Sequence, residues 1–141
     1  MQIILREITK KDWDFILTLR NNSFTDTFFE QKKPIEKNEH YQYMEKQNSN
    51  PNFHQWIATD GDVDVAYVRI LDEDVSIMVD KKFQAKGIGT IILNLLEDKA
   101  LRLGIKKLKA TVMIGNESSK KIFLKNNYAL TMCFYEKILS N

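Results

Sequence analysis

The stretch Gln84-Ala85-Lys86-Gly87-Ile88-Gly89-Thr90 decides the fold of this chain. It lies between a short β-like run at residues 75–79 and a helix-like run at residues 91–103. A strand that passes through a glycine-rich turn into a helix presents free backbone N–H groups at the positive end of the helix dipole. Such a turn holds a phosphate or pyrophosphate without dedicated side chains. The stretch therefore predicts an anion-binding loop between a strand and a helix.

The residues of this loop narrow the choice of ligand class. Gly87 and Gly89 permit a positive φ and let a ligand approach the backbone closely, and Lys86 adds a positive charge beside them. The loop lacks the Gly-Lys-Ser/Thr ending of an ATP-type phosphate loop and the third glycine of a dinucleotide fingerprint. On two glycines alone an ordinary turn before a helix is an equal alternative. The surrounding pattern favours the anion site.

Hydrophobic periodicity predicts one α/β domain over residues 1–141. Strands are expected at residues 2–8, 53–59, 63–71, 75–79 and 107–114, helices after Thr9 up to Arg20 and at 36–47, 91–103 and 117–125, a loop or broken helix at 21–33, and one or two strands at 128–139. The strands first alternate as a meander and then as strand-helix-strand. This order predicts a mixed, mostly antiparallel sheet with helices on both faces.

Composition excludes several classes of function. The 141 residues are 43% hydrophobic and 28% charged, with a net charge of +2 and scattered basic residues, so nucleic-acid binding is not expected. No apolar run approaches the ~20 residues of a membrane helix. One cysteine and two histidines without ligand spacing predict no metal site. The single Cys133, without a secretory signal pattern, favours the cytoplasm, and its apolar surroundings predict that it is buried.

Two motifs together resemble a known family. The pattern Gln-x-x-Gly-x-Gly, from Gln84 to Gly89, resembles the acyl-CoA pyrophosphate loop of the GNAT superfamily of N-acetyltransferases. Further along, Asn116-Glu117-Ser118-Ser119, then Phe123, then Asn127-Tyr128, is similar to that family's Asn-x-x-Ala…Tyr-x-x-x-Gly-Phe. The family's order of elements covers residues 63–139. The resemblance implies acetyl-CoA as co-substrate and a primary amine on a small molecule as acceptor.

The resemblance also implies which residues bind acetyl-CoA. The strand at 75–79 splays from the next strand, and the free backbone groups of Ile77 and Val79 bind the pantetheine arm. The amides of residues 84–90 hold the pyrophosphate. Asn116 matches the asparagine that contacts the CoA arm, although a helix N-cap explains the same residue equally well.

The catalytic acid and base are less clearly marked. The family often uses a tyrosine to protonate the leaving thiolate, but Phe123 stands at that position and has no proton to give. Tyr135 is the replacement that we expect, and water is an alternative because a thiol pKa is only about 8.5. Glu73 is the expected base, with Asp74 and His54 as alternatives. A solvated turn and an ordinary histidine explain these three residues as well.

The acceptor is expected to meet the first two helices. Leu19-Arg20-Asn21, Pro34-Ile35, and Glu39-His40 with Tyr43 are similar to a GNAT branch that acetylates nucleotide-linked amino sugars, including the pseudaminic-acid pathway enzyme. Arg20, Asn21 and His40 are the expected contacts to phosphate or hydroxyl groups. Helix capping by Arg20 and Asn21 is the structural alternative. A small-amine or protein N-acetyltransferase, or a non-catalytic acyl-CoA-binding domain, remains open, as does a monomer or homodimer.

Overall fold

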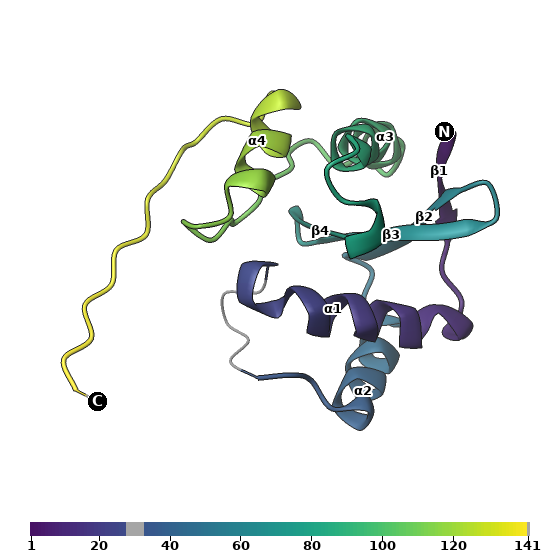
Figure 1. The fold of residues 1–141 in the computed structure, drawn as a ribbon, viewed down its shortest axis with the longest axis horizontal. Coiled ribbons are helices and arrows are strands. Elements are labelled where there is room, and N and C mark those ends of the chain that lie inside the picture. Colours follow the sequence, from purple (N-terminus) through teal and green to yellow (C-terminus); the bar gives the residue numbers. More distant parts are fainter. Residues whose placement is uncertain (28–32, 141) are drawn as a thin grey trace.

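A four-stranded antiparallel sheet in the order β1-β2-β3-β4 forms the centre of the computed structural model, which describes residues 1–27 and 33–140 (Figure 1). The strands are β1 Ile3–Glu7, β2 Phe53–Asp60, β3 Val63–Leu71 and β4 Asp74–Val79, the helices are α1 Trp13–Thr27, α2 Lys37–Gln47, α3 Ile88–Arg102 and α4 Glu117–Lys125, and two 3₁₀ turns are η1 Lys10–Asp12 and η2 Lys81–Phe83. The mixed α/β class predicted from the sequence is confirmed.

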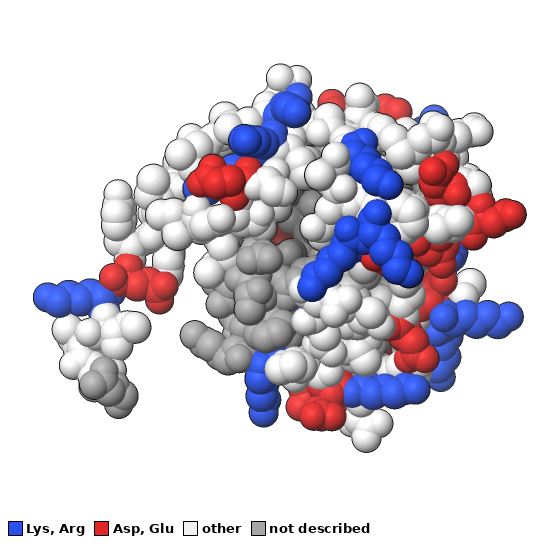
Figure 2. Space-filling view, in the orientation of Figure 1, with Lys and Arg blue, Asp and Glu red and all other residues white. Residues whose placement is uncertain are grey.

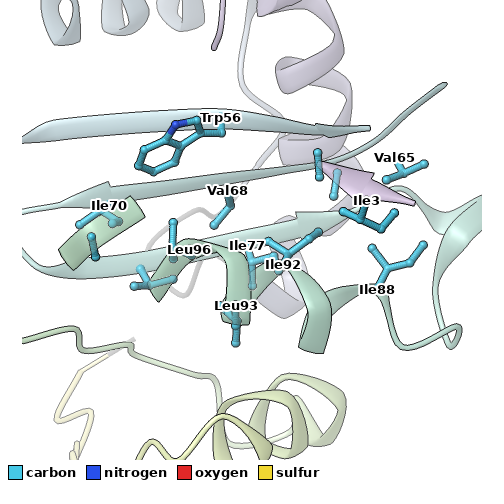
Figure 3. Close-up of a cluster of buried hydrophobic side chains, with 14 of the residues drawn as sticks. Ile3, Trp56, Val65, Val68, Ile70, Ile77, Ile88, Ile92, Leu93 and Leu96 are labelled. Carbon is cyan, nitrogen blue, oxygen red and sulfur yellow. The ribbon is translucent and has the colours of Figure 1, made fainter. Parts of the chain in front are cut away.

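Helices cover both faces of the sheet and give the domain two cores. α1 and α2 lie on one face and α3 and α4 on the other (Figure 1). Strand residues alternate between the two faces, so Trp56 joins the core under α3, whereas its neighbour Ile57 joins the core under α1 and α2. The core under α3 also includes Ile92 and Leu96, whose side chains point at the sheet (Figure 3).

Two tight turns join the last three strands. Gly61, with φ of 61°, lies in the turn that pairs Asp60 with Val63. The next turn pairs Leu71 with Asp74 and holds Asp72 and Glu73 at φ of 48° and 75°. Two-residue hairpin loops of this handedness favour Gly, Asn or Asp. Glu73 is therefore held in an uncommon backbone conformation.

An ion pair connects β1 to the start of α1. The Arg6 guanidinium donates to both carboxylate oxygens of Asp12, at 2.9 and 2.8 Å, and to Asp64 at 3.1 Å. Asp12 also accepts from the Thr9 N–H at 2.9 Å. The Arg6 hydrogen bonds lower the pKa of Asp12 below its ordinary value despite its burial. This bidentate contact sets where α1 begins.

The C-terminal third differs from the sequence prediction. Within residues 107–114, only Lys109 makes a strand-type bridge, a parallel one to Asp74. Residues 128–139 are described but form no strand, and Cys133 is exposed rather than buried. Alternating apolar residues favour extended backbone, but a strand also needs a paired edge. These expectations were wrong because, among the described residues, neither segment has a neighbouring strand that pairs along its length.

Candidate functional site

The loop before α3 has the geometry expected of an anion site. Gly87, with φ of 78° and ψ of 6°, is the N-cap residue, and the first bond of the helix runs from the Ile91 N–H to the Gly87 oxygen at 3.3 Å. The N–H groups of Ile88, Gly89 and Thr90 therefore have no acceptor within the helix. Ala85 also has a positive φ, 62°, which costs about 1–2 kcal/mol without a glycine. Strain of this kind is typical of ligand-binding turns.

The two glycines have different roles. A Cβ on Gly87 would meet nothing within 4 Å, so this position needs glycine for its φ alone. A Cβ on Gly89 would lie 2.6 Å from the Cδ1 atom of Ile122 in α4. Position 89 therefore requires a residue without a side chain, because α4 packs closely against α3 there. A side chain at position 89 would therefore meet α4, and the contact of the Gly89 N–H with a pyrophosphate stays a prediction.

Positive side chains surround the loop. Lys81, Lys82 and Lys86 are all exposed, and basic side chains gather over this region in Figure 2. Gln84 holds the loop to the end of β4, because its Nε2 atom donates to the Val79 oxygen at 3.0 Å. The side chain of Gln84 thus has a structural contact, whereas its predicted role toward a ligand rests on its backbone.

The outer edge of β4 opens beside this loop. The Val75 N–H donates to the Lys109 oxygen at 2.8 Å, and the Lys109 N–H donates to the Glu73 oxygen at 3.0 Å. Because alternate residues of a strand direct their amides to the same edge, Ile77 and Val79 face this side too. Among the described residues, no backbone group of residues 110–114 bonds to them. β4 and this segment therefore diverge toward the loop, which is the splay that the resemblance implied.

Asn116 and Phe123 lie in α4 or at its start. The Asn116 Oδ1 atom accepts from the Ser119 N–H at 3.1 Å, which confirms the N-cap. Phe123 is buried and packs edge-on against Tyr128 at 4.9 Å between ring centroids. Tyr135 is 88% exposed, on the extended segment after α4. The isolated chain therefore does not bring Tyr135 to β4.

Glu73 lies at the opposite end of β4 from the glycine loop. Six residues of strand separate the two ends, roughly 17–20 Å. Glu73 and His54, two of the candidate bases, line one open cavity of about 490 Å³ with Asp72 and Lys106. This cavity lies where α3 ends, since Gly104 and Ile105 also line it. The structure thus places two candidate bases together, at a distance from the anion site.

His40 is fully buried and both its ring nitrogens have protein partners. Nε2 lies 2.7 Å from the Trp13 carbonyl oxygen, and Nδ1 lies 3.0 Å from Arg20 Nη1. A carbonyl needs a donor and a guanidinium needs an acceptor, so the proton is on Nε2 and the ring is neutral. Burial lowers the pKa of His40 below its ordinary value. His40 consequently positions Arg20 and offers no atom to an acceptor in this state.

Arg20 and Asn21 stabilise the same region. The Arg20 guanidinium lies 5.0 Å from the centre of the Tyr43 ring. The Asn21 side chain accepts from the Ile35 N–H at 2.7 Å and donates to the Ile35 oxygen at 3.1 Å, which fixes the chain ahead of α2. The helix-ending role considered for Asn21 does not apply, because α1 continues to Thr27.

The sequence interpretation missed three polar residues near Arg20. Gln55, Tyr67 and Arg69 share the sheet face under α1 and α2, since Gln55 pairs with Arg69 across the strands and Tyr67 lies two residues before it. The Tyr67 hydroxyl donates to Gln55 Oε1 at 2.8 Å, and Arg69 donates to Asp74 Oδ2 at 3.2 Å. Burial raises the pKa of Tyr67. The available signal was Tyr67 and Arg69, two positions apart in the otherwise apolar run of residues 65–71.

Within the described part of the chain, no three His, Cys, Asp or Glu side chains gather in a way that could hold a metal ion. None of the described helices has the length and apolar character needed to span a membrane.

A protein sequence and a solved structure from Methanocaldococcus jannaschii are similar to this chain. The chain is 26% identical, over an alignment 130 residues long, to an uncharacterized protein of Methanocaldococcus jannaschii. The alignment covers 86% of this chain and 27% of that protein, so the chain spans about a quarter of this relative's length. A crystal structure of a domain from the same organism is similar at 25% identity, with a TM-score of 0.80 over 92% of this chain and 90% of the other.

A second solved structure has a similar fold. The spermidine N-acetyltransferase from Vibrio cholerae, in complex with CoA and spermine, is 18% identical, with a TM-score of 0.85 over 99% of this chain and 88% of the other. The sequence model of the acetyltransferase (GNAT) family matches residues 13–128, which include α1, the glycine loop and α4. The chain therefore belongs to the GNAT family.

Proposed function

We propose that this chain is an acetyl-CoA-dependent N-acetyltransferase that moves an acetyl group from the CoA thioester to a primary amine. The observation that carries the proposal is the continuity of two backbone surfaces. The open edge of β4 comes first along the chain, η2 follows it, and the three N–H groups without helical acceptors come next, at the start of α3. A pyrophosphate suits the first surface and the amides of a pantetheine arm suit the second.

The reaction needs few protein groups. The amine attacks the thioester carbon, the oxyanion collapses, and the C–S bond breaks to release the CoA thiolate. The chain holds the thioester along β4 and aligns the amine with it. The attacking amine loses one proton, for which we propose Glu73, acting through water, because its carboxylate stands at the start of β4. The thiolate gains a proton from water, or from Tyr135 if the segment after α4 pairs with the sheet.

The CoA site is tested by a matched pair of substitutions at Gly87. Asp and Asn have the same size and both tolerate a positive φ, and the space around this Cβ is open. A carboxylate about 6 Å from a phosphate costs roughly 3 kcal/mol at an effective dielectric of about 20, less after screening by salt. We expect Gly87→Asp to raise the Kd for CoA by about tenfold or more relative to Gly87→Asn in calorimetry. Equal affinities of the two variants would refute the loop as the pyrophosphate site.

For the acceptor, we propose an amine that carries an anionic group, such as a nucleotide-linked amino sugar. Arg20 supports this proposal because its guanidinium lies on the Tyr43 ring, where burial first and then repulsion from the Arg69 charge lower the pKa of Arg20. A phosphate or carboxylate would relieve that repulsion. A small polyamine or a peptide N-terminus is the second candidate.

Arg20→Lys and Arg20→Ala together test the acceptor proposal. Lysine keeps a donor for His40 but loses the planar fork that binds phosphate. We expect Arg20→Lys to raise the acceptor KM roughly tenfold while the KM for acetyl-CoA stays unchanged. An unchanged acceptor KM in Arg20→Lys, with a loss of stability in Arg20→Ala, would assign Arg20 to structure alone.

Release of the CoA thiol distinguishes an enzyme from a sensor. Acetyl-CoA is incubated with a nucleotide-linked amino sugar, spermidine or a short peptide, and free thiol is measured over time. We expect release that depends on the amine and survives dialysis against a chelator. Tight CoA binding without release for any amine would favour the non-catalytic acyl-CoA-binding alternative.

We also propose a reducing compartment, the cytoplasm, for this protein. The support is Cys133, whose thiol is free and exposed in the structure. Exposed thiols persist where glutathione and thioredoxin keep them reduced. Fractionation of cells that produce the protein tests this proposal directly.

A further inference from the structure

The segment after α4 presents an unusual amount of apolar surface. Residues 129–140, here called the tail, extend from α4 as an arm that leaves the body of the domain (Figures 1 and 2). Its large apolar side chains are each more than 80% exposed: Leu130, Met132, Phe134, Tyr135, Ile138 and Leu139. Isolated exposed apolar residues are ordinary, but a contiguous set of this size marks an interaction surface.

Residues 107–114 lie beside β4 as an open edge, where Lys109 alone bonds to the sheet and the described residues give Leu108 and Ala110 no backbone hydrogen bond. Lys109 directs its N–H and C=O at β4. In an extended chain the neighbours of Lys109 direct theirs to the opposite side, so the backbone groups of Leu108 and Ala110 face outward. The side chains of Leu108, Ala110 and Val112 pack against the core under α3. This edge, once completed by another strand, would extend the sheet and cover that core.

We propose that the tail of one copy pairs with the edge at residues 107–114 of a second copy, and that the second tail pairs with the first edge. One two-fold axis satisfies both tails and both edges. The second copy is favoured over the same chain because the tail runs away from its own domain (Figure 1). In addition, if the tail returned to its own domain through α4, it would lie parallel to residues 107–114. The charges of Glu136 and Lys106 instead favour antiparallel pairing, as the register below shows.

One antiparallel register matches both the apolar and the charged residues. It places Phe134 opposite Leu108, Met132 opposite Ala110 and Leu130 opposite Val112. Residues directly opposite each other share a face of the sheet, so all three tail residues would extend the core under α3. The same register places Glu136, the acidic residue of the tail, opposite Lys106. In the parallel register that aligns the same apolar residues, Glu136 instead faces Ile114.

Cross-linking through Cys133 tests this register. In the antiparallel pairing Cys133 lies opposite Lys109, at a non-hydrogen-bonded pair with Cα atoms about 4.5 Å apart. That distance suits a disulfide, and the chain has one cysteine. We expect Lys109→Cys, oxidised with copper-phenanthroline, to run as a covalent dimer on a non-reducing gel. The sulfur atoms each lose one electron to Cu(II) when the bond forms.

Thr111→Cys is the matched control. In the antiparallel register, position 111 lies diagonally from Cys133 at about 7–8 Å, too far for a disulfide. In the parallel pairing within one chain it lies directly opposite. We expect little cross-linking of Thr111→Cys. A fast-migrating monomer from either variant would show pairing within one chain and overturn the proposal.

Light scattering provides a second, independent measurement. The unsubstituted chain should have twice its 16.6 kDa mass in solution. Phe134→Asp places a charge on the apolar face and should halve the measured mass, whereas Thr131→Asp, on the opposite face, should leave the dimer intact. A monomeric unsubstituted chain at 50 µM, or a dimer that survives Phe134→Asp, would refute the exchange of tails.

Discussion

Substitution of Gly89 by alanine tests how α3 and α4 pack. The added Cβ would lie 2.6 Å from Ile122 Cδ1, and 3.4 and 3.5 Å from Ile122 Cγ1 and Cγ2. Carbon atoms in contact prefer about 3.5–4.0 Å, so only the terminal methyl of Ile122 has to move. Turning it off its rotamer costs about 0.5–1.5 kcal/mol, and overpacking in general costs about 1–3 kcal/mol.

A second substitution reverses the sign of this effect. Alanine is preferred to glycine in a helix by about 0.5–1 kcal/mol, which offsets part of the clash. We therefore expect Gly89→Ala to lower the free energy of unfolding by about 0.5–1.5 kcal/mol. Ile122→Val removes Cδ1, and in that background Gly89→Ala should raise the free energy of unfolding by about 0.5 kcal/mol. The coupling between the two positions is then about 1–2 kcal/mol.

Urea unfolding of the four proteins of this cycle measures the coupling. Trp13 and Trp56 are both buried, one in each core, so their fluorescence reports on the two faces of the sheet. Affinity for CoA serves as the control, because the new methyl group points at α4, and should change by less than about threefold. Equal destabilisation by Gly89→Ala in both backgrounds would refute the assignment of this glycine to helix packing.

Three further predictions concern buried polar groups. The folded-state pKa of His40 lies below its unfolded value, so the stability that its neutral form provides is complete above about pH 6.5. As the pH falls below that value, this stability is lost at up to about 1.4 kcal/mol per pH unit. Urea midpoints measured from about pH 7.5 to 5 should show this slope, and His40→Gln should flatten it. Arg20→Ala leaves the buried Nδ1 of His40 without its donor and should cost about 1–3 kcal/mol in thermal unfolding, whereas an unchanged midpoint would contradict the contact. Tyr128→Phe should leave the free energy of unfolding in urea unchanged or raise it by about 1 kcal/mol. The Tyr128 hydroxyl is buried without a hydrogen-bond partner in the described structure, and burial raises its pKa to about 12. A clear loss of stability in this variant would reveal a partner.

The sequence predicted the elements whose determinants are local. β3 and β4 follow from alternating apolar residues, and the turns between strands follow from Gly and Asp. The α4 helix was predicted with the right bounds because Asn116 provides its cap. In the site, the glycine loop and the β4 edge were predictable because backbone geometry there depends on Gly87 and on strand periodicity.

Features that depend on distant partners were not predictable. Residues 107–114 and 128–139 alternate like strands, but alternation does not reveal whether an edge is available to pair. Gly89 matched a ligand motif, yet its neighbour Ile122 lies 33 positions away along the chain. The contact between Arg20 and His40 depends on how α1 packs on α2. Sequence periodicity predicts which side of an element is apolar, and it does not predict what that side meets.

The order of strands in the sheet has a consequence for how the domain folds. β2, β3 and β4 are neighbours both in the sheet and along the chain, joined by turns of two residues. Such hairpins close with little loss of chain entropy, whereas β1 reaches β2 only across α1 and α2. Residues 53–79 should therefore form the folding nucleus, with Φ-values highest in the β2–β3 hairpin. As the ribosome releases the chain, this meander is complete before α3 emerges to cover it.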